Sequence, residues 1–180
     1  MESVAPEKLS LRPFQMSDAD DLMMVMGDDR VANFCRFDTL TCREDAVKYL
    51  EGVAIPHPWY RAICVEGRAV GLMCVMMGAK ENHCRGEIGY AVGFEYWGLG
   101  IATLAVKMVM SSVFMEFPHL ERLEALVDVE NRGSQRVLEK CGFLKEGLLR
   151  KYNFLKGKTR DVFIYSVIST DPCCGLVVGD

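Results

Sequence analysis

The sequence has no apolar stretch long enough to resemble a membrane span. Its first residues, Met1 to Lys8, lack a basic region followed by an apolar core, which argues against a secretory signal. The lysines and arginines are scattered through a chain of formal net charge -4, and no basic stripe is interleaved with aromatic residues. These absences argue against a membrane or a nucleic acid as partner.

The eight cysteines show no paired metal-ligand spacing, so no metal site is predicted. Cys64 and Cys74 lie in apolar strand-like runs, where a reduced cysteine behaves as a small hydrophobic residue. This usage favours a reducing compartment, and we expect a cytoplasmic location, with the nucleus left open. Cys173 and Cys174 follow Pro172 in a tail where a frayed terminus fits better than lipidation or oxidation.

Length and composition indicate one globular domain. The chain has 180 residues, of which 50% are hydrophobic and 26% are charged, enough for a sizeable core. No linker-like segment interrupts it. We therefore expect a single domain over residues 1–180, with a core at about 9–168 and a tail at 169–180.

Runs of β-branched, aromatic and apolar residues predict strands, and capping signals predict helices between them. The expected strands are Leu9–Arg12, Trp59–Val65, Ala69–Met77, Glu87–Val92, Leu123–Val127, Phe143–Tyr152 and Val162–Ile168, the last two around a turn at Lys156-Gly157-Lys158. The expected helices are one capped by Ser17 and ended by Gly27, one at Arg30–Phe34, one opened by a capping box of Thr41 and Glu44, and two at Gly98–Phe117 and Asn131–Lys140.

This order is typical of an α+β fold around a mixed sheet. A crossover helix joins the strand that ends at Val92 to the strand that starts at Leu123, so these two strands are expected to be parallel. If parallel neighbours splay at one end, they open a cleft for a long, thin ligand with amides, such as pantetheine.

The segment from Tyr96 to Thr103 is a glycine-rich turn between a strand and a long apolar helix. Gly98 and Gly100 permit close approach of a ligand, and the N–H groups that open a helix favour a phosphate. A tight connection explains such a turn about as well. The turn lacks the lysine and hydroxyl of a P-loop, and Thr103 stands where a dinucleotide fold has its third glycine.

The same segment resembles a known motif. Trp97-Gly98-Leu99-Gly100-Ile101-Ala102 is similar to the acyl-CoA pyrophosphate motif of the GNAT N-acetyltransferase superfamily, although Trp97 replaces the usual Gln or Arg. Glu87–Tyr90 upstream and Asn131–Ser134 with Val137–Phe143 downstream resemble the RimJ/RimL-type subgroup. The joint occurrence of these motifs in order, across nearly the whole chain, is far more specific than any one of them.

The resemblance implies a three-layer α/β/α fold with a mixed, mostly antiparallel sheet of about seven strands and a splayed central parallel pair. It implies transfer of an acetyl group from acetyl-CoA to an amine by direct attack in a ternary complex. The cofactor-binding residues that it implies are Tyr90, Ala91, Val92, Trp97, Gly98, Leu99, Gly100, Ile101, Ala102, Thr103, Asn131, Arg132 and Ser134.

Two residues are catalytic candidates. Glu87 could take the ammonium proton of the acceptor, although a structural role for a strand glutamate is equally consistent with the sequence. Ser134 could stabilise the departing thiolate, because Leu138 stands where many family members have a tyrosine; a helix-capping hydroxyl is the alternative. Asn153 stands where some subgroup members carry an acidic residue, which leaves the proton route open.

The acceptor is expected to be a protein N-terminal amine or a small amine, and the chain a monomer or a weak homodimer. The segments expected to select the acceptor, at about Met26–Glu51 and Asn153–Arg160, are the least diagnostic in the sequence. The alternative function is an acyl-CoA-binding sensor or interaction module without turnover, which Asn153 and the missing tyrosine motivate.

Overall fold

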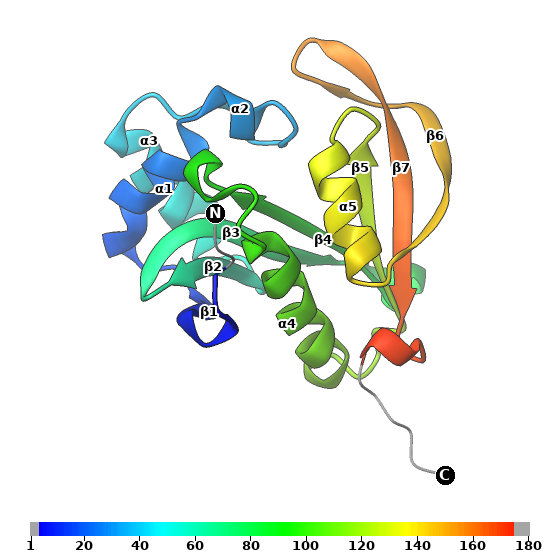
Figure 1. Cartoon of the computed structure of the whole chain (residues 1–180). Helices are drawn as coiled ribbons and strands as arrows, with labels where there is room; N and C mark the ends of the chain where they lie inside the picture. Colours follow the sequence, from blue (N-terminus) through cyan, green and yellow to red (C-terminus); the bar gives the residue numbers. More distant parts are fainter. Residues whose placement is uncertain (1–3, 175–180) are drawn as a thin grey trace. The chain divides into compact units, whose positions relative to one another are not determined.

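The computed structural model describes residues 4–174, so the side chain of Cys174 and the tail beyond it lie outside the described part. Seven strands form one mixed sheet in the order β1-β2-β3-β4-β5-β7-β6 (Figure 1). They are β1 (Leu9–Pro13), β2 (Tyr60–Val65), β3 (Arg68–Met77), β4 (Arg85–Val92), β5 (Arg122–Asp128), β6 (Leu144–Leu155) and β7 (Lys158–Ile168). The predicted mixed sheet is confirmed.

The predicted parallel pair is also confirmed. Residues Arg85–Glu87 of β4 pair in parallel with Arg122–Glu124 of β5, whereas the β1–β2, β2–β3, β5–β7 and β6–β7 pairs are antiparallel. By their contacts the residues divide into two compact units, described separately below: 4–74 with 89–105, and 75–88 with 106–174.

The first unit carries three short helices, α1 (Ala19–Met26), α2 (Asp29–Ala32) and α3 (Arg43–Tyr49). Their apolar side chains form one buried cluster with the sheet; it contains Leu22, Met26, Leu50, Tyr60 and Leu72. Burial of large apolar side chains contributes roughly 1.5–3 kcal/mol each, which exceeds what such short helices gain from intrinsic propensity. The tertiary cluster therefore stabilises these helices.

Two predicted helix starts are wrong. Ser17 lies inside a 3₁₀ turn, Met16–Asp18, and does not cap α1. The neighbouring Asp18 organises that turn, because its carboxylate accepts the Gln15 N–H and binds both terminal nitrogens of Arg12 at 2.7 Å. The end of α1 is as predicted: the N–H of Gly27, the C-cap, donates to the Met23 carbonyl.

The start of α3 differs in a similar way. Its N-cap is Cys42, not Thr41, and the acidic partner is Asp45 rather than Glu44. The Asp45 carboxylate accepts both the Thr41 hydroxyl at 2.9 Å and the Thr41 N–H at 3.3 Å. The sequence contains two acidic residues in a row here, and only the folded chain shows which of them reaches back.

The second unit contains most of α4 (Ile101–Glu116), all of α5 (Arg132–Lys140) and a long hairpin of β6 and β7, orange in Figure 1. Lys156 and Gly157, both at positive φ, make the predicted turn, and positive φ at both central residues is typical of a two-residue hairpin turn. The buried Tyr165 of β7 donates its hydroxyl to Glu139 of α5, and burial raises the pKa of Tyr165 to about 12. No helix among residues 4–174 has the length and apolarity to cross a membrane.

A network of charged side chains holds the start of β5. Arg85 and Arg122 bind the buried Glu124 carboxylate at 3.1 and 2.8 Å, and Arg122 also binds Glu146 at 2.6 and 2.8 Å. Ser166 donates a further hydrogen bond to Glu146 at 2.7 Å. The bonds from Arg122 and Ser166 lower the pKa of Glu146 to about 2, from an ordinary value of 4.5.

The lowered pKa of Glu146 predicts a loss of stability in acid. The ionised Glu146 carboxylate contributes fully to the free energy of unfolding above about pH 4.5. This contribution disappears as the pH falls towards 2, because the protonated carboxyl loses its ion pair. Glu146 is partly exposed, so we expect Glu146→Gln to lower the free energy of unfolding by only about 1 kcal/mol at neutral pH. Urea unfolding of the wild type and of Glu146→Gln between pH 2 and 7 checks this. A difference in free energy of unfolding that stays constant over this range would contradict it.

Candidate functional site

The glycine turn of the first unit has an open backbone. Gly98 and Gly100 have φ of +79° and +80°, and a Cβ at either position would meet no atom within 4 Å. Helix α4 begins at Ile101, and its Leu104 N–H donates to the Gly100 carbonyl at 3.0 Å. The N–H groups of Ile101 and Ala102 therefore precede Leu104, whose N–H makes this bond, as in helix starts that bind phosphate.

Trp97 fastens this turn to the preceding strand. Its indole Nε1–H donates to the carbonyl of Val92, the last residue of β4, at 2.7 Å. Phe94 lies against the Trp97 ring with centroids 5.0 Å apart, and the Arg30 guanidinium lies over the Phe94 ring, 3.4 Å from its centroid. Trp97 thus fixes the turn through a bond that the sequence pattern alone did not indicate.

Other predicted cofactor-binding residues lie in the same unit. Ala91 and Val92 are buried at the end of β4, and Tyr90 is half-buried there. Leu99 accepts a hydrogen bond from the Val4 N–H at 3.1 Å, so the N-terminal segment also holds the turn. Ile101 is buried beneath the helix start, while Ala102 and Thr103 are half-buried. The structure therefore gathers Tyr90–Val92 and Trp97–Thr103 in the first unit.

The second unit carries the remaining predicted residues, Glu87, Asn131, Arg132 and Ser134. The cap of α5 is Asn131, whose Oδ1 accepts the Ser134 N–H at 3.1 Å. The N-cap of α5 is therefore Asn131, and Ser134 contributes its backbone N–H to that cap. Leu138, one turn later, is fully buried in the core. Arg132 is exposed at the first position of the helix.

The loop before α5 is held by side chains that the sequence pattern did not reveal. Asp128, the last residue of β5, accepts the Glu130 N–H at 2.8 Å through its carboxylate and the Asn131 N–H at 2.9 Å through its carbonyl. Gln135 donates to the Asp128 and Val129 carbonyls at 3.2 and 3.0 Å. These bonds fix the backbone that presents Asn131.

Glu87 is half-buried in the part of β4 that pairs with β5, directly opposite Glu124. Residues paired in this way project to the same face of a sheet, and so do residues two apart along a strand. Glu87 therefore shares its face with Arg85 and with the buried Glu124. This places a carboxylate beside an ion-pair network, which is consistent with both roles considered for Glu87.

Asn153 lies on β6 opposite Arg160 of β7. Its side-chain Oδ1 is buried and has no hydrogen-bond partner among the described residues. An amide cannot act as a carboxylate base, so Asn153 cannot supply one.

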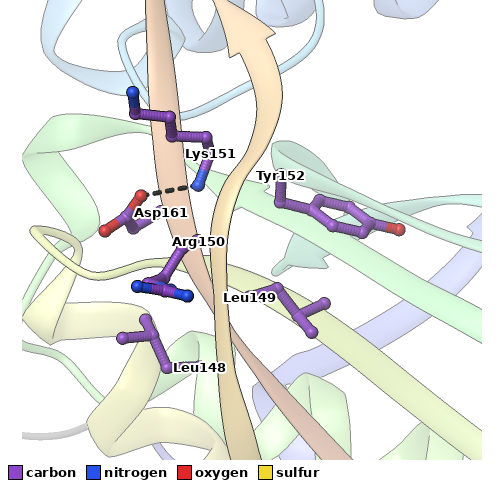
Figure 2. Close-up of a pocket in the computed structure, with 6 residues that line it drawn as sticks. All are labelled: Leu148, Leu149, Arg150, Lys151, Tyr152 and Asp161. Carbon is purple, nitrogen blue, oxygen red and sulfur yellow. Dashed lines mark hydrogen bonds between the residues drawn. The ribbon is translucent and has the colours of Figure 1, made fainter.

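An irregularity in β6 opens a hollow next to Asn153. Between the pairs Leu149–Val162 and Asn153–Arg160, three residues of β6 face the single residue Asp161. Lys151 adopts φ +48°, and its N–H donates to the Asp161 carboxylate at 2.7 Å (Figure 2). The hollow has a volume of about 620 Å³ and is lined by Leu148, Leu149, Arg150, Lys151, Tyr152 and Asp161. It includes none of the predicted site residues.

Comparison with known proteins identifies the family of this chain. The family model described as "Acetyltransferase (GNAT) domain" matches residues 8–144. The "Uncharacterized N-acetyltransferase p20" of Bacillus licheniformis is 32% identical over 95% of this chain and 98% of its own length. The "Putative ribosomal N-acetyltransferase YdaF" of Bacillus subtilis is 33% identical over 92% of this chain and 93% of its own.

Among solved structures, Mycobacterium smegmatis RimJ in complex with CoA-disulfide superposes with a TM-score of 0.78 at 26% identity. The match covers 93% of this chain and 86% of that one. The range that the family model matches includes the segments Trp97–Ala102 and Asn131–Ser134. The chain belongs to the GNAT family of acetyltransferases.

Proposed function

We propose that this acetyltransferase moves an acetyl group to a primary amine, which attacks directly in a ternary complex. Acetyl-CoA, the cosubstrate, supplies an acetyl group activated as a thioester. The observation that carries the proposal is the open glycine turn at the start of α4, where Gly98 and Gly100 leave the backbone accessible. Trp97–Thr103 would hold the diphosphate, Tyr90–Val92 the pantetheine arm, and Asn131, with Arg132 beside it, the same arm from α5.

The chemistry divides between two side chains. Glu87 accepts a proton from the acceptor ammonium, directly or through water, so that the neutral amine can attack the thioester carbon. A backbone N–H of Ala91 or Val92 polarises the carbonyl oxygen. The new carbon–nitrogen bond replaces the carbon–sulfur bond. Ser134 donates a hydrogen bond or its proton to the departing sulfur, and when it donates its proton its oxygen takes up the second proton that the attacking nitrogen loses. The cap bond from the Ser134 N–H to the Asn131 Oδ1 fixes the backbone that carries this hydroxyl.

We propose a protein N-terminal amine as the acceptor, with a small amine as the second candidate. A relative named as a putative ribosomal acetyltransferase and the structural similarity to RimJ support the first choice. The seven described cysteines form no disulfide bond, which supports action in a reducing compartment such as the cytoplasm. We further propose a monomer or a weak homodimer.

An acceptor screen tests the proposed function. Release of CoA is measured with acetyl-CoA and a panel of N-terminal peptides, the same peptides acetylated beforehand, and a polyamine such as spermidine. Release that requires a free peptide amine supports the proposal, and release with the polyamine alone moves the acceptor to small amines. Binding of acetyl-CoA without acceptor-dependent release would favour the sensor or interaction module.

For Ser134→Ala we expect kcat to fall about tenfold with little change in the Kd for acetyl-CoA, because a general acid contributes to departure of the thiolate rather than to binding. Circular dichroism should show an intact helix, since Asn131 retains the cap. Arg136→Ala, an exposed change one position beyond Gln135 on the same helix, serves as a control. An unchanged kcat would remove Ser134 from the mechanism.

A further inference from the structure

A buried ion pair joins the β6–β7 hairpin to the loop that opens α5. Arg160 of β7 binds the carboxylate of Asp128 with its Nη1 at 3.0 Å, and the two side chains are only 5% and 7% exposed. Burying two charges costs several kcal/mol per ion unless geometry and further hydrogen bonds offset it. A buried ion pair is weak evidence for a gain in stability. The segments that this pair connects, the hairpin and the loop before α5, indicate a different role.

On the hairpin side, Arg160 also approaches the Leu155 carbonyl across the turn at 3.5 Å. On the loop side, Asp128 shapes the backbone up to Asn131. Further contacts run in parallel: Glu130 accepts from Arg160 at 3.4 Å and pairs with Lys158 at 3.5 Å, and the Val129 N–H donates to the Asp161 carbonyl at 3.2 Å. The guanidinium therefore lies where both segments meet.

The backbone pairing between β6 and β7 is interrupted next to Arg160. Three residues of β6 face the single Asp161, and the buried Oδ1 of Asn153, opposite Arg160, has no partner among the described residues. Since the strand pairing is interrupted here, the orientation of the hairpin depends on contacts with neighbouring segments. The pair with Asp128 is the most buried of these contacts that involve Arg160.

We propose that Arg160 and Asp128 are a positioning pair, through which the cosubstrate bound at Asn131 and Ser134 orders the β6–β7 hairpin. This inference rests on the proposed function, because it takes Asn131 and Ser134 to contact acetyl-CoA. The hairpin and the loop then move together. Binding of the cosubstrate to the loop before α5 therefore lowers the frequency of local opening in the β6–β7 hairpin.

Positioning and stability can be separated because the pair can be replaced without leaving a charge behind. Arg160→Met alone would bury an unpaired carboxylate and destabilise the protein. In Asp128→Asn/Arg160→Met both charges are gone, and the Asn side chain still accepts the Glu130 N–H. Replacement of a buried ion pair by uncharged residues is often neutral for stability, so we expect this double variant to melt within about 5 °C of the wild type.

The test uses CoA as the probe, with calorimetry for its Kd and hydrogen exchange for the peptide that covers residues 151–160. In the wild type, saturating CoA should slow exchange in this peptide about threefold or more. In the double variant the slowing should disappear and the Kd for CoA should rise about tenfold, because the loop is no longer held in place. Arg160→Lys, which keeps a buried cation, should recover part of the response.

The exposed pair Lys8–Glu66, at 2.9 Å between the 3₁₀ turn that precedes β1 and the β2–β3 turn, provides the matched control. Lys8→Met/Glu66→Gln likewise removes one positive and one negative charge. It should leave unchanged both the Kd for CoA and the slowing of hydrogen exchange at residues 151–160. Wild-type-like slowing in the Asp128→Asn/Arg160→Met variant, or no slowing in the wild type despite CoA binding, would overturn the positioning role. Absence of any CoA binding by the wild type would instead overturn the proposed site, and the positioning role with it.

Discussion

Gly100→Val is expected to raise the KM for acetyl-CoA by about 100-fold while the protein stays folded. Gly100 has φ +80°, where a β-branched residue is strained by about 1–3 kcal/mol, and the new side chain would occupy the open space in front of the helix N-terminus. Both effects act on the backbone that would face the diphosphate. Initial rates at varied acetyl-CoA concentrations, with calorimetry for binding, measure the change.

Gly67→Val separates the conformational cost from the loss of the binding surface. Gly67 has φ +86° in the turn between β2 and β3, and a Cβ there also meets no atom within 4 Å. The control should therefore lose a similar amount of thermal stability and keep the KM for acetyl-CoA of the wild type. If both variants change KM equally, or if neither does, the glycine turn is not the diphosphate site.

Glu87→Gln is expected to lower kcat by about 100-fold at neutral pH, with the Kd for acetyl-CoA nearly unchanged. A general base contributes about 10²–10⁴-fold, and the isosteric amide cannot accept the ammonium proton. The deficit should shrink as the pH rises towards the pKa of the acceptor amine, because more acceptor is then already neutral. The measurement is the pH profile of kcat with the acceptor found in the screen.

Glu146→Gln supplies the control for Glu87, since it alters the ion-pair network at the start of β5 without touching the proposed base. If Glu87 is purely structural, the two variants should resemble each other, with lower stability and an unchanged shape of the pH profile. A Glu87→Gln enzyme with wild-type kcat at every pH would remove Glu87 from the mechanism.

Features governed by local backbone chemistry could be predicted from the sequence. The glycine turn and the turn at Gly157 follow from glycines that adopt positive φ, and Gly27 ends α1 where a Cβ would lie 2.6 Å from the Met23 carbonyl oxygen. The parallel pairing of β4 with β5 follows from the intervening helix, because a crossover returns the chain in the same direction. These inferences need no knowledge of distant contacts.

Features that depend on tertiary partners could not be predicted. Arg160 and Asp128 are 32 residues apart, and nothing in either local sequence indicates that the guanidinium reaches the end of β5. The choice of Asp45 over Glu44 at the start of α3, and of Asn131 over Ser134 at α5, depends on which side chain reaches the backbone in the fold. The indole bond of Trp97 is of the same kind, since the motif position ordinarily holds Gln or Arg.

The bond from Trp97 to Val92 also gives the protein an intrinsic optical reporter. The chain has two tryptophans: Trp59 is 3% exposed, whereas Trp97 is 43% exposed beside the glycine turn. In a Trp59→Phe background all indole emission comes from the residue that touches the proposed diphosphate site. Quenching or a spectral shift on addition of CoA would then follow ligand capture in real time, without label or acceptor.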